Sequence, residues 1–346
     1  MQNLFGRAAA RFFPPPERLA VPSFKLPFKL PVDGYVLLLL ATVAVAAILP
    51  ARGVGAEVMD KVTYLAVAVL FFLYGARLSP KAILDGILHW RLQGLVLLTT
   101  FAFFPLLGLG ITTLFRPLLG TDLAFGLMFL AVLPSTVQSS IAFTSIAHGN
   151  VPAALCSASV SNILGIVLTP MLVAVFLSSH GAGFSLDSLR DIGLQLLLPF
   201  VIGQLVRPML GSWIVRHKRL TTIVDRGSIL LIVYAAFSEG VVAGVWSQLS
   251  WDSLILVILL DMLMLAIVLV ATTWVSRRLG FSREDEIAVV FCGSKKSMAS
   301  GIPMANILFA GQAVSLIVLP LMLFHQIQLI VCADLARRYA ARKAAS

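Results

Sequence analysis

Charged residues are scarce in this chain. They make up 12% of the 346 residues, whereas apolar residues make up 59%, and the mean hydropathy is +0.97. Soluble globular chains are roughly 45–50% apolar and about 25% charged. The chain therefore has too few polar side chains to cover the surface of a soluble domain, and its composition also excludes a disordered protein.

Cysteine and catalytic motifs are equally sparse. The three cysteines, Cys156, Cys292 and Cys332, lie in separate apolar stretches without a CxxC pair, which excludes a disulfide framework and argues against a zinc site. The chain also lacks HExxH and GxSxG motifs, so we do not expect an enzyme. No apolar core followed by a small-residue cleavage site precedes residue 34, so no cleavable signal peptide is expected.

Long apolar runs are what the chain has in abundance. A membrane-spanning helix needs about 20 mostly apolar residues, and about ten such runs account for most of the sequence. The sequence therefore predicts an all-α polytopic membrane protein with ten transmembrane helices. The expected spans lie near 35–50, 60–77, 92–114, 122–147, 151–177, 192–211, 226–247, 251–275, 285–309 and 312–335.

The positive charges support ten spans. If both termini are cytoplasmic, 20 of the 26 Lys and Arg fall on the cytoplasmic side and four fall outside, while Lys295 and Lys296 lie within the membrane. Such an excess on one side is the positive-inside rule. It accounts for the net charge of +10 without a nucleic-acid partner and places the protein in an inner or plasma membrane.

The first 34 residues form a basic, proline-rich segment that contains the repeat FKLP-FKLP. Its cations alternate with aromatic residues and prolines, which suits a cytoplasmic segment on anionic membrane lipid. A plain cytoplasmic tail is the alternative. A second basic cytoplasmic tail is expected over 336–346.

Ten spans divide into two halves of five, 35–177 and 192–335. An odd number of spans per half gives the halves opposite orientations, and inverted repeats of this kind are typical of secondary transporters. Their binding sites lie on interrupted helices near the middle of the membrane. The corresponding spans of the two halves, the fourth and the ninth, are therefore the place to search.

Both of these spans contain a helix breaker followed by small polar residues. The fourth reads LPSTVQSS over 133–140, and the ninth reads FCGSKKSMASGIP over 291–303. Non-helical backbone is tolerated at this depth only where it lines a cavity in the protein, and there it can bind an ion or a polar solute. Close helix packing is the alternative role for the serines. The polar candidates are Gln138, Ser139, Ser140, Ser294, Ser297 and Ser300, and, in the adjoining fifth span, Ser157, Ser161 and Asn162.

Lys295 and Lys296 make packing alone a poor explanation. One cation at the centre of a spanning helix costs roughly 2.5–3.5 kcal/mol on insertion scales, so such residues face a cavity or a partner. Three further embedded groups, Glu239, Asp261 and His325, are candidates for coupling ion movement to transport. A packing role for His325, or an ion pair of Asp261 with one of the lysines, is the alternative.

Two blocks of sequence resemble a known family. They are LPSTVQSSIAFTSIAHGNVPAALCSASVSNILGIVLTP over 133–170 and FCGSKKSMASGIPMANILFAG over 291–311, followed by LPLMLFHQIQLI. They are similar to the bile acid:sodium symporter superfamily, and most similar to the branch of solute carrier family 10 member 7 and its bacterial relatives. The resemblance extends over about 35 to 335.

The resemblance implies a panel of spans 1, 2, 6 and 7 packed against a core of spans 3–5 and 8–10, in which the broken spans 4 and 9 cross. Related bile acid transporters bind two sodium ions near this crossing and move an organic anion by alternating access. By this resemblance Gln138, Ser139, Ser140 and hydroxyls of span five would line a cation site, with sodium near Ser139, Ser140 and Ser294. Beyond sodium, no cofactor is implied.

The chain departs from that pattern over Ser294–Met298, where relatives supply a glutamate and main-chain carbonyls. It has no carboxylate there and instead has two lysines. A lysine disfavours a sodium ion within about 4–6 Å. Its ammonium would either take the place of the cation permanently or gain and lose a proton. We therefore expect the sodium coupling to be lost or altered, with Lys296 as the functional lysine, and an anionic organic substrate.

The sequence is also compatible with a second function. The chain could be a regulatory membrane protein that does not transport and that affects ion or calcium homeostasis through partners, with the basic N-terminal segment as its contact site. Deletion of residues 1–30 would separate the two functions, because a transporter should keep its solute and ion binding without them.

Overall fold

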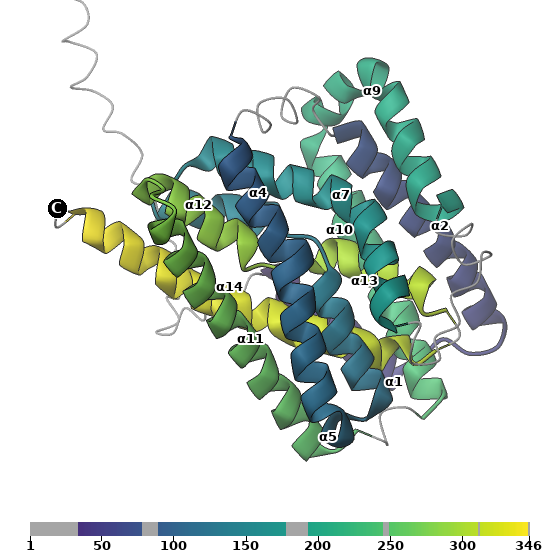
Figure 1. Cartoon of the computed structure of the whole chain (residues 1–346). Helices are drawn as coiled ribbons and strands as arrows, with labels where there is room; N and C mark the ends of the chain where they lie inside the picture. The colour runs from purple at the N-terminus through teal and green to yellow at the C-terminus, as the bar shows by residue number, and fades with distance from the viewer. Residues whose placement is uncertain (1–33, 78–88, 178–192, 245–248, 311, 345–346) are drawn as a thin grey trace, which may run out of the picture. The chain divides into compact units, whose positions relative to one another are not determined.

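The computed structural model describes residues 34–77, 89–177, 193–244, 249–310 and 312–344. Every regular element in these ranges is a helix, as the composition predicts (Figure 1). The predicted N-terminal segment lies outside the described residues up to residue 33. The helices are α1 (Gly34–Ile48), α2 (Val54–Arg77), α4 (Trp90–Leu98), η2 (Thr99–Phe103), α5 (Phe104–Val132), α6 (Gln138–Ile146), α7 (Val151–Leu177), η4 (Gly193–Leu197), α9 (Leu198–Arg216), α10 (Lys218–Val242), α11 (Trp251–Arg278), α12 (Arg283–Gly293), α13 (Met298–Leu308) and α14 (Val314–Ala344).

The helices have the length and composition of membrane spans. Among the described residues, five helical stretches are long and apolar enough to cross a membrane: Trp90–Val132, Val151–Leu177, Lys218–Val242, Trp251–Arg278 and Val314–Ala341. Many large apolar side chains on them are exposed, which suits contact with lipid. The expectation of an integral, multi-pass membrane protein is therefore confirmed.

Helix α11 carries a tryptophan near each end. Trp251 is 78% exposed and Trp274 is 58% exposed. The 23 residue steps between them correspond to about 35 Å of helix. Tryptophan is enriched at both membrane–water interfaces, and the hydrocarbon core is about 30 Å thick. The spacing fits a helix that crosses the bilayer.

The helical stretch Trp90–Val132 turns back within its length. Its 43 residues would extend about 65 Å as a straight helix, twice the thickness of the hydrocarbon core. Gly120 interrupts the helical geometry with φ 72° and ψ 178°, a conformation that glycine adopts without the steric cost of a side chain. The chain can thus form two spans, one on each side of Gly120.

Two helices are broken in mid-course. Helix α5 ends at Val132 and α6 begins at Gln138, because Pro134 cannot donate a main-chain hydrogen bond. Helix α12 ends at Gly293 and α13 begins at Met298, where the hydroxyl of Ser297 caps α13 by accepting a hydrogen bond from the amide of Ser300 at 3.2 Å. These are the two places at which the sequence predicts interrupted helices.

The helices pack in two groups (Figure 1). Helix α2 packs against α9 and α10, and α1 packs against α10; we call these four helices the α2–α9 group. Helices α4, α5, α6, α7, α11, α12, α13 and α14 form the second group, which we call the crossing group because it contains both broken helices. Helix α10 contacts α13 and α14 and so joins the groups.

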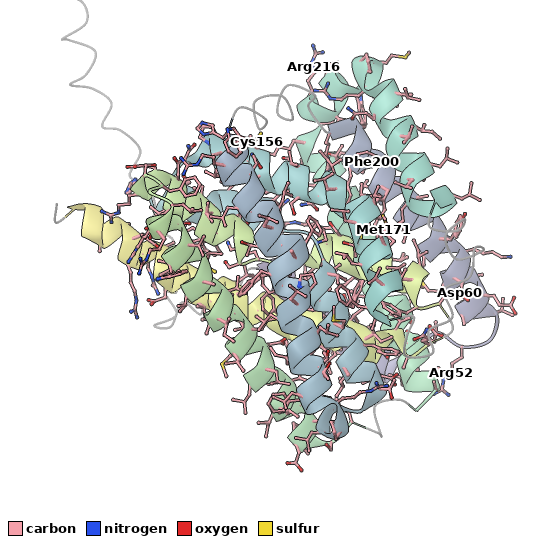
Figure 2. The ribbon with its side chains drawn as sticks, viewed as in Figure 1. Arg52, Asp60, Cys156, Met171, Phe200 and Arg216 are labelled. Atoms are coloured by element: carbon pink, nitrogen blue, oxygen red, sulfur yellow. The ribbon has the colours of Figure 1, made fainter. Side chains whose placement is uncertain are left out.

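Helices α2 and α9 approach each other through glycine. A side chain at Gly75 would lie 2.0 Å from the carbonyl oxygen of Phe200, and one at Gly203 would lie 2.1 Å from that of Phe72. Figure 2 shows Phe200 on α9, with Arg216 at one end of this group and Arg52 at the opposite end. The two Phe-x-x-Gly sequences therefore contact each other reciprocally, main chain against main chain.

The C-terminal residues continue a helix. In the stretch 336–346, where the sequence predicts a basic tail, α14 continues as a helix to Ala344. Alanines alternate with cations in this stretch, and both residue types favour helix.

Candidate functional site

The two breaks cross and bind each other through main-chain groups. Ser135 donates its hydroxyl to the carbonyl of Cys292 at 2.6 Å, and the amide of Ser297 donates to the carbonyl of Pro134 at 2.8 Å. Each break therefore supplies a donor to a carbonyl of the other. The crossing is buried, with Ser135 and Ser294 fully inaccessible.

Pro134 leaves carbonyls without their helical donors at the end of α5. The amide of Ser135 would bond the carbonyl of Ala131 in a continuing helix, but it bonds Ser161 Oγ at 3.0 Å instead. The carbonyl of Val132 accepts from Thr169 Oγ1 at 2.9 Å. Buried carbonyls are costly when unpaired, so those of Ala131 and Leu133 require donors from elsewhere.

A third free carbonyl arises in η2, a π-helical turn. There the amide of Phe104 bonds the carbonyl of Thr99, five residues back, and the next residue, Pro105, has no N–H. The carbonyl of Thr100 thereby loses its usual main-chain donor. It faces the crossing, where it accepts from a side chain of the other break.

Lys296 satisfies all three carbonyls. Its Nζ donates to the carbonyls of Thr100 at 2.9 Å, Ala131 at 2.7 Å and Leu133 at 2.7 Å. An ammonium has three N–H donors, so its capacity is filled. The Nζ also lies 4.1 Å from the centre of the Phe104 ring, a cation–π contact. The residue is 0% exposed. Three carbonyls and an aromatic face thus surround the ammonium as they would a small bound cation.

Lys295 points to a different part of the crossing. Its Nζ donates to the carbonyl of Ser139 at 2.9 Å and lies 3.8 Å from the centre of the Phe143 ring and 5.2 Å from that of Phe291. It is also 0% exposed. Within the described residues neither lysine has an ion pair with a carboxylate. The two lysines therefore make the crossing a positive centre.

Gln328 of α14 fixes the main chain of Lys296. Its Oε1 accepts from the amide of Lys296 at 3.0 Å, and its Nε2 donates to the carbonyl of Lys296 at 3.0 Å. The same Nε2 lies 2.9 Å from Nδ1 of His325. Because that nitrogen of Gln328 can only donate, Nδ1 of His325 accepts. His325 is therefore connected to the crossing through Gln328.

The candidates on α7 hold the two breaks together. Asn162 donates to the carbonyl of Ser135 at 2.6 Å and accepts from Ser300 Oγ at 2.8 Å, while Ser297 Oγ donates to Ser300 Oγ at 3.1 Å. Ser161 accepts from the amide of Ser135, as described above. Ser157 is buried and its hydroxyl has no hydrogen-bond partner among the described residues.

The hydroxyls predicted for sodium are engaged within the protein. Ser140 Oγ donates to the carbonyl of Phe291 at 3.0 Å, Ser294 Oγ donates to that of Val290 at 2.6 Å, and Ser139 Oγ shares a hydrogen bond with Thr136 at 2.6 Å. The ammonium of Lys295 occupies the carbonyl of Ser139. This donor set does not fit a sodium ion unless these bonds are exchanged.

Among the described residues, three remaining candidates form no hydrogen bond or ion pair with either lysine side chain. Gln138 is exposed at the start of α6, and Glu239 is exposed near the end of α10. Asp261 is buried on α11, and neither of its carboxyl oxygens has a hydrogen-bond partner among the described residues. The alternative of an ion pair between Asp261 and Lys295 or Lys296 is therefore not seen.

Several residues of the crossing were not predicted as site residues. Thr100 and Phe104 contact Lys296, Thr169 caps Val132, and Gln328 fixes the Lys296 main chain. Pro105 in an otherwise apolar run was the available signal for the first pair. Thr169 carries no such signal, because its contact comes from a different span.

The chain is similar to known proteins over most of its length. A family model described as the SBF-like CPA transporter family matches residues 33–341. An uncharacterized protein of Pseudomonas aeruginosa is 54% identical over 312 residues, covering 90% of this chain and 94% of that protein.

Two further relatives have names that state a function. The Escherichia coli protein named "Putative symporter YfeH" is 50% identical over 309 residues, covering 89% of this chain and 93% of that protein. The sodium/bile acid cotransporter 7 of Rattus norvegicus is 32% identical over 280 residues, covering 78% of this chain and 80% of that protein.

Proposed function

The chain belongs to the SBF-like CPA transporter family, and we propose that it moves a small organic anion across the membrane by alternating access, with Lys296 as a built-in cation. The family is one of transporters, and the chain is not an enzyme. The name of the rat relative supports an organic solute as cargo. The anionic charge of that solute and the role of Lys296 are inferred from the crossing.

One observation carries this proposal. The Lys296 ammonium fills its three donors with the carbonyls of Thr100, Ala131 and Leu133. A sodium ion bound by these carbonyls would join the π-helical turn to the end of α5, and the ammonium joins both to the second break as well, because Lys296 belongs to that break. The ammonium performs that joining permanently, so the crossing does not need a dissolved cation at this position.

The charge of the crossing supports an anionic solute. Lys295 and Lys296 are both fully buried, and within the described residues no carboxylate pairs with either. Two uncompensated cations in a low-dielectric site attract an anion strongly. A solute with a carboxylate, sulfate or phosphate group would neutralise the centre when a conformational change admits it.

The proposed architecture is ten spans in two inverted repeats of five, with both termini cytoplasmic. The reversal at Gly120 supports a third and a fourth span, and α12 with α13 supports a broken ninth. The reciprocal bonds Ser135 to Cys292 and Ser297 to Pro134 suit two breaks related by a pseudo-two-fold axis. Alternating access would then be movement of the α2–α9 group against the crossing group.

The built-in cation is tested by replacing it. Lys296→Ala removes the ammonium and leaves three inward carbonyls, so we expect a lower melting temperature that sodium, potassium or methylammonium chloride partly restores. A ligand that binds only the folded state raises its stability by mass action. The wild type should show no such response relative to choline chloride at equal ionic strength. Lys61→Ala, at an exposed position on α2, is the control.

The opposite pattern would overturn the role of Lys296. The proposed role of Lys296 is wrong if the wild type melts at a higher temperature in sodium chloride than in choline chloride and Lys296→Ala shows the same difference. Sodium would then bind independently of the lysine, and transport would be coupled to sodium as the resemblance to bile acid transporters implies.

Transport itself is tested in proteoliposomes on a supported membrane. Each of a panel of small dicarboxylates, disulfonates and phosphates, whose charge one co-transported proton does not cancel, is applied without a sodium gradient, and the evoked current is recorded. We expect at least one anion to evoke a current that Lys295→Met and Lys296→Met remove and Lys61→Ala keeps. A panel without any response, together with a cellular effect lost on deletion of residues 1–30, would favour the regulatory function instead.

A further inference from the structure

One ionisable group within the membrane-spanning part is not used by the crossing. Asp261 lies on α11, the most apolar of the five long spans, with a mean hydropathy of 3.1. It is 10 residues from Trp251 and 13 from Trp274, the two exposed tryptophans, so it is far from both ends of the span. The carboxyl group is 0% exposed.

The carboxyl group of Asp261 has no partner. Both Oδ1 and Oδ2 are buried without a hydrogen bond to any described residue. A buried, unpaired carboxylate is among the most costly groups that a protein can contain, whereas the neutral acid costs far less. This conformation therefore accommodates Asp261 as the protonated acid.

Ionisable groups on the packed helices do not compensate Asp261. Helices α5, α12 and α14 pack against α11. Within the described residues, none of their ionisable side chains forms an ion pair or a hydrogen bond with it. Those side chains are Arg116 and Asp122 on α5; Arg283, Glu284, Asp285, Glu286 and Cys292 on α12; and His325, Cys332, Asp334, Arg337, Arg338 and Tyr339 on α14, with Asp252, Arg277 and Arg278 on α11 itself.

Asp261 is also separate from the lysines. Thr272, on the same buried face of α11, lies beside Gly293 at the crossing, with its methyl carbon 3.3 Å from the position of a side chain there. Eleven residue steps of helix, about 16 Å, separate Thr272 from Asp261. The acid is therefore a second ionisable site in the crossing group, not a counter-ion of the first.

From this placement we propose that Asp261 is the site at which the transporter binds and releases its coupling proton. The inference rests on the proposed function, because coupling presupposes transport. In the present conformation the site holds one proton on the carboxyl group. In a conformation that admits water to α11, the O–H bond breaks, the proton passes to water and the carboxylate remains until a proton returns.

A permanent ammonium at the crossing explains why a second group is needed for coupling. Lys296 cannot leave with the solute, so it cannot supply energy from an ion gradient. Asp261 can, because its protonation state depends on whether the surroundings are dry or hydrated, and that dependence links the proton to the conformational equilibrium. One fixed charge and one exchangeable proton thus perform what two dissolved cations would.

The proton is tested first by infrared spectroscopy of the purified full-length protein. We expect the C=O stretching band of a protonated carboxyl group in the wild type at about pH 6, and we expect it to weaken towards about pH 8. Asp261→Asn should lose this band, whereas Asp252→Asn, in the first turn of α11, should keep it. A spectrum unchanged by Asp261→Asn would overturn the proposal.

Hydrogen–deuterium exchange distinguishes an acid that gains and loses a proton from a protonated acid that only packs. For the wild type we expect deuterium uptake in α5, α11 and α14, corrected for the intrinsic pH dependence of amide exchange, to differ between about pH 6 and about pH 8 as the acid ionises and the site hydrates. The difference should be lost in Asp261→Asn and retained in Asp261→Glu and Asp252→Asn. Corrected uptake that is independent of pH in the wild type, or a corrected pH response that survives in Asp261→Asn, would overturn the proposal.

The two proposals fail separately. The methylammonium and anion experiments use no variant of Asp261, so they can succeed when these measurements fail. If the anion currents are absent but the infrared band and the pH response depend on Asp261, the acid binds a proton in a protein that does not transport the tested anions.

Discussion

At the residue scale, Lys296 illustrates how a cation is stabilised within a membrane. Its cost is offset by three carbonyls, each of which lacks a helical donor for a local reason: Pro134 for those of Ala131 and Leu133, and the π-helical turn before Pro105 for that of Thr100. The charge and the helix breaks therefore depend on each other. Without the lysine the carbonyls would be buried and unpaired, and without the breaks they would be occupied.

A prediction at this scale concerns Gln328, whose amide pairs with both main-chain groups of Lys296. Gln328→Leu should lower the free energy of unfolding by about 1–3 kcal/mol for each buried group that is left unpaired. Chemical denaturation in detergent measures the loss. Gln326→Leu, on the same helix and half-buried, is the matched control and should have a much smaller effect.

A second variant of Gln328 separates packing from hydrogen bonding. In a medium where the new acid is neutral, Gln328→Glu keeps an acceptor for the Lys296 amide and one O–H donor, which cannot serve both the Lys296 carbonyl and His325, so its loss should be smaller than that of Gln328→Leu. An equal loss of unfolding free energy for Gln326→Leu and Gln328→Leu would show that the two hydrogen bonds from Gln328 to the Lys296 main chain contribute nothing specific to stability.

At the element scale, the breaks and the close helix pairs determine the architecture. Glycine allows α2 and α9 to touch at Phe72–Gly75 and Phe200–Gly203, and it allows α5 to approach α14, because a side chain at Gly126 would lie 2.5 Å from the carbonyl oxygen of Ile317. Helices in lipid associate through such packing, since lipid tails are as apolar as the side chains. Each glycine contact therefore contributes directly to helix association.

Gly75 and Gly203 give the prediction at this scale. Gly75→Ala and Gly203→Ala should each lower the free energy of unfolding by about 1–3 kcal/mol, because the added methyl group meets main chain that cannot rotate away. Gly227→Ala on α10, where a side chain would meet nothing within 4 Å, should be neutral or stabilising by about 0.5–1 kcal/mol.

Thermal unfolding of the three variants in the same detergent measures this difference. If Gly75→Ala is as stable as Gly227→Ala, the contact between α2 and α9 is looser than described. The double variant of Gly75 and Gly203 should lose less than the sum, because one separation of the helices relieves both clashes.

At the scale of the whole molecule, the distribution of charge predicts its orientation. Arg216 lies at the end of the α2–α9 group opposite Arg52, and the ends rich in Lys and Arg are expected to face the cytoplasm (Figure 2). A cytoplasmic reporter at the C-terminus, such as green fluorescent protein, should be active. A periplasmic phosphatase at the same position should be inactive, whereas one inserted near Arg52 should be active.

Activity of the phosphatase at both positions would contradict an even number of spans. Adding lysines beside Arg52 is the control: it should weaken the preference, since cations next to spans set the orientation.

The extent of prediction from sequence differs between these scales. The helical fold, its membrane character and both breaks follow from composition and from Pro134 and Gly293, because they depend on local chemistry. The crossing residues Ser161, Asn162 and Ser300 could also be proposed, since polar side chains in a span require partners. The partners themselves could not be predicted: Thr100 lies 196 residues from Lys296, and a single sequence contains no signal that joins them.

The two lysines show the limit most clearly. Adjacent residues diverge by about 100° on a helix, so the sequence alone cannot say which one faces which cavity. Packing separates them: Lys296 reaches the end of α5 and the π-helical turn, whereas Lys295 reaches α6 and two phenylalanine rings. Glu239 and Asp261 diverge similarly, since one is exposed and the other is buried without a partner.

By itself, the sequence determined that the protein lies in a membrane, that it is helical and where its helices break, because hydrophobicity, proline and glycine act over a few residues. The tertiary structure alone decided which carbonyls receive the Lys296 ammonium and which acid remains unpaired. Both depend on distances between helices that are remote in the chain, and those distances are set by the packing of the whole crossing group.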